Sequence, residues 1–168
     1  MRQMKTERNP LQRAEGSARW EQGTHRSVVM AAVYGPTQTQ ARKEDVDKLA
    51  IEVCWRPPFG LQTPADVDAE RALRRTLEQI VLTAKYPRLG LRVVVQVISA
   101  DGAVEACAMN ATCHALMDAG VEMFGTLVAA TVAIPKIIDG DTAGDALGPC
   151  ADPTEDEERD AAAVGTFA

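Results

Sequence analysis

Apolar and polar residues alternate along the first third of the chain, which is the pattern of half-buried β-strands. Residues 16–36 predict a β-hairpin with a turn at Gln22-Gly23 and a second, apolar strand over 27–33. Gly35-Pro36 is expected to end that strand. Residues 49–55 predict another strand, so we expect an antiparallel sheet from this part of the chain.

The spacing of apolar residues changes to a helical period after residue 66. The apolar residues that share one helical face are Ala69, Leu73, Leu77, Ile80, Val81 and Ala84. Asp66 or Asp68 is expected to cap the start of this helix, because a short side-chain oxygen can accept from the free amides of a first turn. Tyr86-Pro87 is expected to end it.

A second helix is predicted between two apolar strands. Residues 91–99 predict a central strand, and Asp101-Gly102 a turn. Residues 103–119 are apolar almost all round, so this helix should be buried between layers and end at Gly120. Residues 124–134 predict a strand that Pro135 closes, and 164–167 predict a last strand after an acidic turn.

This order of elements predicts an α+β domain with two main helices packed on a mostly antiparallel sheet. The chain has 168 residues, enough for one domain with a core. Residues 1–13 show no clear periodicity and are expected to be a flexible N-terminal lead-in to a single domain over 14–168.

Composition and charge narrow the function. No apolar run approaches the length of a membrane span, and the N-terminus lacks the apolar segment of a secretory signal, so we expect an intracellular protein without a membrane. The net charge of −6 argues against strong independent nucleic-acid binding, which depends on Lys and Arg neutralising phosphates.

The turn before the second helix is the first candidate site. A helix N-terminus can hold an anion with its backbone amides. Here, however, Glu105 would repel a phosphate. We favour the simpler interpretation, in which Asp101 caps the helix and Glu105 complements its dipole.

The acidic residues and the cysteines are weaker candidates for a functional site. An acidic tail could bind Mg²⁺, although acidic runs on a protein surface are more often simply solvated. The acidic residues of this tail are Asp152, Glu155, Asp156, Glu157, Glu158 and Asp160. The cysteines lack zinc spacing and are expected to be reduced thiols rather than metal ligands; they are Cys54, Cys107, Cys113 and Cys150.

Basic and aromatic residues offer a possible nucleic-acid surface. Arg71, Arg74 and Arg75 on the first helix could contact a nucleic-acid backbone, and a solvated polar face is at least as good an interpretation. Trp20 and Trp55 could stack on bases, but such residues more often fill a core edge or an interface.

Five blocks in order resemble the RNase PH family, in particular the RNase PH-like ring subunits of the eukaryotic RNA exosome. The blocks are GSARWEQG with SVVMAAVYGP, then LAIEVCWRP, ERALRRTLEQIVL, YPRLGLRVVVQVISADG with NATCHALMDAGV, and the acidic stretch ADPTEDEERDAAAVGTFA. The resemblance covers about residues 11–168. It implies a ribosomal protein S5 domain 2-like fold. It also implies a place in a ring through which RNA passes beneath cap proteins.

The same resemblance implies a degenerate active site. Where active members read ADGGTRTAS this chain reads ADGAVEACA, so Val104 and Glu105 replace the Thr and the phosphate-binding Arg. The family's paired aspartates align with Glu158 and Val164. Of the family's helix motif, Arg71 and Arg75 are retained and the last Arg is Glu78. The resemblance thus implies the fold without phosphorolysis, hence no enzyme, no cofactor and no metal.

The expected function is therefore a non-catalytic structural ring subunit that supports 3′-to-5′ RNA processing and degradation in the nucleus, nucleolus and cytoplasm. Arg71, Arg75 and the strand-end residue Arg56 are the candidates for RNA contact. Partners would be other RNase PH-like ring subunits and cap proteins, and the isolated chain could form a homodimer. Family members continue past the position of Ala168 into a last strand and a C-terminal helix, which is expected to be missing here.

Two alternatives stay open. The first is an enzyme on the same fold, either a homodimeric metal-dependent nuclease that uses Asp152, Asp156 and Glu158 or a residual phosphorolytic 3′–5′ exoribonuclease. The second is an oligomerisation module that makes no contact with nucleic acid.

Overall fold

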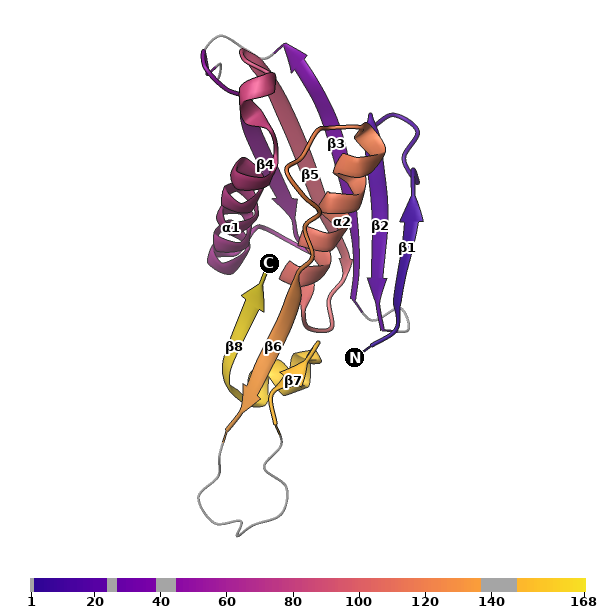
Figure 1. Cartoon of the computed structure of the whole chain (residues 1–168). Coiled ribbons are helices and arrows are strands. Elements are labelled where there is room, and N and C mark those ends of the chain that lie inside the picture. Colours follow the sequence, from indigo (N-terminus) through magenta and orange to yellow (C-terminus); the bar gives the residue numbers. More distant parts are fainter. Residues whose placement is uncertain (1, 24–26, 39–44, 137–147) are drawn as a thin grey trace.

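The computed structural model describes residues 2–23, 27–38, 45–136 and 148–168. It contains a five-stranded sheet in the order β1-β2-β3-β5-β4 and a three-stranded sheet in the order β7-β6-β8, with two long helices (Figure 1). The strands are β1 (Met4–Arg8), β2 (Gly16–Gln22), β3 (Ser27–Gln38), β4 (Ala50–Arg56), β5 (Leu89–Ser99), β6 (Ala130–Pro135), β7 (Cys150–Ala151) and β8 (Ala161–Phe167). The helices are α1 (Pro64–Ile80), α2 (Val104–Ala119), the short α3 (Glu155–Asp160) and a 3₁₀ turn over Thr83–Lys85.

The larger sheet is mixed rather than wholly antiparallel. β2 and β3 form the predicted antiparallel hairpin, and β5 is the predicted central strand between β3 and β4. The prediction that residues 49–55 join the antiparallel part was wrong, because β4 pairs with β5 in parallel. α1 explains this pairing, since it carries the chain back to the end of the sheet at which β4 began, as a parallel connection requires.

Two strand boundaries also differ from the predictions. Residues 4–8, inside the expected lead-in, form β1 on β2; all five are exposed, so no burial pattern marks the strand. β3 does not end at Gly35-Pro36. It continues to Gln38 after an irregularity in its pairing with β5, because Thr37 and Gln38 regain partners there.

The N-cap of α1 lies three residues before Asp66, the first of the two predicted caps. Thr63 is the N-cap: its hydroxyl accepts from the Asp66 amide, and the Asp66 carboxylate accepts from the Thr63 amide. Asp66 therefore completes a capping box rather than serving as the cap itself. The helix ends at Ile80 and not at Tyr86-Pro87, because Val81 is already extended and bridges to Met123.

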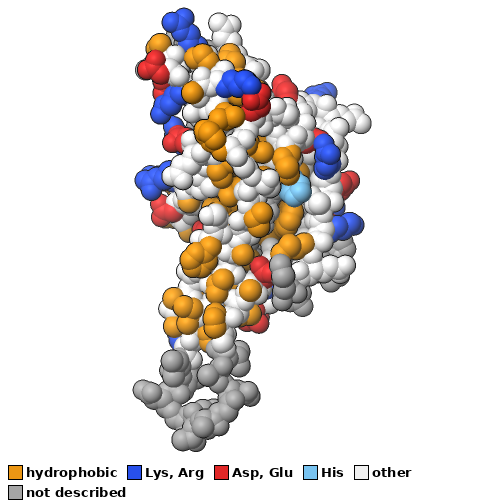
Figure 2. Space-filling view, viewed as in Figure 1, with side chains coloured by type: hydrophobic (Ala, Val, Ile, Leu, Met, Phe, Trp, Pro, Cys, Tyr) orange, Lys and Arg blue, Asp and Glu red, His pale blue; other side chains and the backbone are white. Residues whose placement is uncertain are grey.

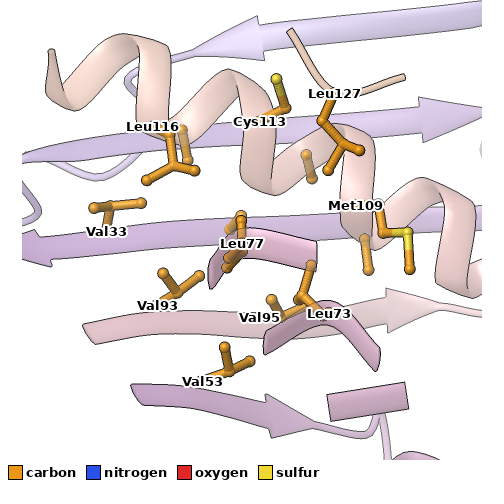
Figure 3. Close-up of a cluster of buried hydrophobic side chains, with 14 of the residues drawn as sticks. Val33, Val53, Leu73, Leu77, Val93, Val95, Met109, Cys113, Leu116 and Leu127 are labelled. Carbon is orange, nitrogen blue, oxygen red and sulfur yellow. The ribbon is translucent and has the colours of Figure 1, made fainter. Parts of the chain in front are cut away.

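The core lies between the two long helices and the inner face of the larger sheet (Figure 3). Odd-numbered residues of β4 and β5 face this core, as the alternating burial along both strands shows. The side chains that meet there include Val33, Val53, Leu73, Leu77, Val93, Val95, Met109, Cys113, Leu116 and Leu127. Full burial of such a side chain stabilises the fold by about 1.5–3 kcal/mol, so the core holds both helices on the sheet.

The chain beyond α2 is less regular than predicted. β6 covers Ala130–Pro135, so only residues 130–134 of the predicted strand over 124–134 form a strand, and the segment before them lies against α2. The Asn110 side chain fixes that segment by accepting from the Ala129 amide and donating to its carbonyl, both at 2.9 Å. The expected acidic turn is α3, which Thr154 and Glu157 cap reciprocally. Residues 137–147, within the expected Gly/Asp-rich loop, lie outside the described residues.

Within the described ranges, no helix is long and apolar enough to cross a membrane. All four cysteines are free.

Candidate anion site and RNA path

The candidate site lies at one end of the larger sheet. β4 and β5 are parallel, so their carboxyl ends meet there, with Arg56 at the end of one strand and the 100–103 turn after the other. Both α1 and α2 begin at this end, which faces the smaller sheet (Figure 1). The fold therefore brings Arg56, the start of α1 and the start of α2 into one region.

The turn before α2 is not capped by Asp101. Ala103 is the N-cap residue, in a left-handed conformation with φ of 52° and without a side-chain cap bond. Its amide donates instead to Glu158 Oε1 of α3 at 2.7 Å. A carboxylate distant in sequence thus supplies the negative charge that the N-terminus of a helix favours. The prediction that Asp101 caps the helix was wrong.

The backbone of this turn is held from three directions. Ser27 Oγ donates to the Gly102 carbonyl at 2.7 Å and accepts from the Asp101 amide at 3.1 Å. Arg2 Nη1 donates to the Asp101 carbonyl at 3.0 Å. On the third side, α3 begins against Gly102, where an added Cβ would lie 2.3 Å from the Pro153 carbonyl oxygen.

Val104 and Glu105, which the resemblance places where active family members bind phosphate, do not favour an anion. Val104 is half-buried and packs against the core, and Glu105 is exposed in the first turn of α2. Val164 lies in β8 opposite Ala133, apart from any carboxylate pair with Glu158. Arg2 Nη1 contacts the turn through the Asp101 carbonyl, while Arg2 Nη2 is buried without a hydrogen-bond partner among the described residues. An incoming phosphate would meet an amide that is already bonded and two carboxylates.

Cys107 lies one turn into α2 and is chemically inert. Burial raises the pKa of its thiol from 9.0 to about 12, and the negative charge of Asp152 adds to this effect. The neutral thiol donates to Gln22 Oε1 at 2.8 Å. Because the thiolate is the nucleophile, a thiol held neutral in this way is structural.

The arginines proposed for RNA contact are all exposed. Arg56 ends β4, and Arg71 and Arg75 lie on α1. Arg71 pairs with Asp68 at 3.2 Å; exposed pairs of this kind contribute little, so its guanidinium is available to a stronger ligand. Within the described residues, Arg75 has no ion-pair partner.

Sequence reasoning missed two residues in this region. Phe59 and Leu61 are 88% and 92% exposed in the loop that joins Arg56 to α1. The Pro-Pro and Gly that surround them were the available signal, since an apolar residue in such a loop has no core to enter. By contrast, Trp55 is buried and its indole N–H donates to Asp66 Oδ1 at 3.1 Å, so it offers no surface for stacking.

Two carboxylates of the acidic tail accept hydrogen bonds from backbone amides of the chain. Glu157 accepts from the Thr154 amide at 2.7 Å, and Glu158 accepts from Ala103. Among the described residues, no group of three or more His, Cys, Asp or Glu side chains is arranged to hold a metal ion.

Comparison with known proteins decides the family. Residues 1–122 match the model of the 3′ exoribonuclease family, domain 1, named RNase PH. The chain belongs to the RNase PH family. The resemblance seen in the sequence is thereby confirmed at the level of the family.

Two curated relatives carry the name exosome complex exonuclease RRP46 homolog. The protein of Oryza sativa subsp. japonica is 43% identical over 116 residues, which are 69% of this chain and 48% of that protein. The protein of Arabidopsis thaliana is 38% identical over 123 residues, 73% of this chain and 51% of that protein. The chain thus spans about half the length of these relatives.

The solved structure of rice Rrp46 confirms the fold. It is 33% identical, superimposes with a TM-score of 0.85, and covers 100% of this chain and 81% of its own. The α+β fold is therefore the RNase PH-like one that the resemblance implied. An Archaeoglobus fulgidus exosome with RNA bound to the active site, 18% identical, has a TM-score of 0.75 over 98% of this chain and 71% of its own, and supports the fold alone.

Proposed function

We propose that this chain is a non-catalytic ring subunit of an RNA exosome, of the Rrp46 type also called exosome component 5. In this role it supports 3′-to-5′ RNA processing and degradation, including that of rRNA, in the nucleus, nucleolus and cytoplasm. Its neighbours are other RNase PH-like subunits and cap proteins, and RNA passes through the assembled ring. The names of its rice and Arabidopsis relatives support the assembly.

The contact between Ala103 and Glu158 carries the non-catalytic part of the proposal. Phosphorolysis requires phosphate to bind at the start of α2, and here the first free amide already binds a carboxylate at 2.7 Å. Glu105 adds a second negative charge in the same turn. Like charges a few ångströms apart cost about 1–4 kcal/mol when screened by solvent, so binding of phosphate is disfavoured.

The molecular surface supports a role among protein neighbours. Apolar side chains gather over β6 and β8 on the visible face (Figure 2). Exposed apolar residues of these elements and the segment before them are Phe124, Val128, Ile134, Val164 and Phe167. Exposed patches of this kind are typical of surfaces that bind other proteins.

Catalysis is tested by following the 3′ end of a single-stranded RNA with and without inorganic phosphate. We expect no release of nucleoside diphosphates by the purified chain, because its anion site is occupied. Release that depends on phosphate would contradict the proposal in favour of the residual exoribonuclease. RNA loss that depends on Mg²⁺ without phosphate, and that disappears on Asp152→Asn, Asp156→Asn and Glu158→Gln, would favour the metal-dependent nuclease.

The RNA path is tested with a matched pair of double variants in the reconstituted ring. Arg71→Ala with Arg75→Ala removes two cations from α1. Lys5→Ala with Arg13→Ala removes two exposed cations near β1, at the opposite edge of the sheet. Crosslinking of RNA to the ring should fall several-fold for the first pair only, since each lost phosphate contact weakens binding. Equal crosslinking by both pairs would favour an oligomerisation module without RNA contact.

A further inference from the structure

Among the residues that the structure describes, β4 pairs only with β5, so its other side is an edge of the larger sheet (Figure 1). Peptide groups alternate between the two sides of a strand, so every second residue of β4 directs its N–H and C=O away from β5. Two hydrogen bonds show which residues these are. The Leu49 amide just before β4 donates to the Thr83 carbonyl at 3.0 Å, and the Trp55 amide donates to Glu70 Oε2 at 3.1 Å.

The chain closes both ends of this edge itself. At the Leu49 end the 3₁₀ turn supplies the Thr83 carbonyl. At the Trp55 end the Glu70 carboxylate takes the amide, and Gln62 Nε2 donates to the Trp55 carbonyl at 3.3 Å. Sheet edges are commonly protected in this way against unwanted pairing.

Between these ends, Ile51 and Val53 direct their backbone groups outward by the same alternation. Within the described residues, these outward groups have no hydrogen-bond partner. We call this two-residue stretch the β4 window. A hollow of about 550 Å³ adjoins both residues and Glu70, and a second of about 530 Å³ adjoins Ile51 and Glu78. Arg74 of α1 lines both hollows.

The chemistry of the window matches a polypeptide backbone. It offers donors and acceptors in alternation at strand spacing, which an extended segment complements by adding a strand. An RNA backbone presents phosphate oxygens, which would face the outward carbonyls and the Glu70 carboxylate. The first hollow, which adjoins both window residues, is lined by two carboxylates and two cations, Glu52 and Glu70 with Arg74 and Arg92. An uncharged extended segment is therefore the ligand that fits.

The shortness of the window identifies the source of that segment. A stable protein interface buries about 1,200–2,000 Å², far more than a stretch of two residues provides. The segment must therefore belong to a protein that also binds this chain elsewhere. We infer that the β4 window takes up a short extended segment of a neighbouring ring subunit as an added strand. This inference rests on the proposed function, which supplies such a neighbour.

Val53 allows a clean test. Its amide points away from β5, so Val53→Pro removes the outward donor and leaves the ladder to β5 formed by its neighbours. Val53→Ala also shortens this buried side chain but retains the amide. Each variant is mixed with the other ring subunits of the same species, and its association constant and the hydrogen exchange of residues 46–56 are measured.

We expect exchange of the Ile51 and Val53 amides in the wild-type chain to slow at least about tenfold on assembly. Val53→Ala should keep that protection at Ile51, whereas Val53→Pro should associate about tenfold more weakly than Val53→Ala. Unchanged exchange in a ring that assembles, or equal association of the two variants, would overturn the inference alone. Failure of the wild-type chain to join any ring subunit would contradict the proposed function. If Val53→Pro does not fold, the exchange of the wild-type amides decides the question.

Discussion

Gly102 lets the start of α3 pack against the turn before α2, where Glu158 of α3 accepts from the Ala103 amide. Its φ is +78°, and an added Cβ would lie 2.3 Å from the Pro153 carbonyl oxygen and 2.7 Å from the Thr154 carbonyl carbon. Gly120 at the other end of α2 has a similar φ of +69° with nothing within 4 Å of the added Cβ. The two glycines thus share a backbone conformation and differ in the space around them.

This difference predicts unequal effects of the same substitution. Gly120→Ala should lower the free energy of unfolding by about 1 kcal/mol, the cost of a left-handed conformation for a residue with a side chain. Gly102→Ala should cost about 1–3 kcal/mol more, because α3 must also move away from the turn. Urea unfolding with unchanged m-values measures both. Equal losses would mean that α3 does not pack against Gly102 in solution.

The structural role of Glu158 could not be predicted from the sequence. Alignment to the family placed it at a catalytic aspartate, and the sequence interpretation treated it as a degenerate catalytic position. Its bond to the Ala103 amide gives it a structural role instead. No periodicity or spacing could reveal this contact, because it joins two elements whose packing only the assembled fold determines.

Elements with a clear pattern of burial were predictable from the sequence. β5 alternates between core and surface, the β2–β3 hairpin is buried along most of its length, and α1 and α2 carry apolar residues at helical or near-continuous spacing. In each of these the hydrophobic pattern follows the geometry of the element, and burial dominates the energetics. Their order was enough for the fold class.

Elements without such a pattern were missed. β1 is exposed along its whole length, and α3 has no buried residue, so neither leaves a hydrophobic signal. The parallel direction of β4 was missed for another reason, since alternation along one strand says nothing about the strand that pairs with it. What escaped prediction was therefore pairing and long-range packing, both of which depend on residues far apart in the sequence.

The stability of the whole molecule should depend on pH in both directions. Burial, aided by the charge of Arg8, lowers the pKa of His114 below its ordinary 6.5. Burial also opposes ionisation of Asp66, but hydrogen bonds from Thr63 and Trp55 outweigh it and lower that pKa below 3.8. In both cases the unfolded chain takes up the proton first, so stability falls as the solution becomes more acidic.

In alkaline solution two thiols matter: their pKa values are raised rather than lowered, and the stability of the fold again falls. Burial raises the pKa of Cys107 from 9.0 to about 12, and burial raises that of Cys113 above 9.0. The unfolded thiols therefore ionise first, and stability is lost as the pH rises above 9.0.

We expect the free energy of unfolding, measured in urea across pH, to be highest between about 6.5 and 9. His114→Asn should flatten the decline just below pH 6.5, and Cys107→Ala should flatten the alkaline one while leaving the acid side unchanged. A decline below pH 6.5 that persists in His114→Asn would assign the acid sensitivity to other groups.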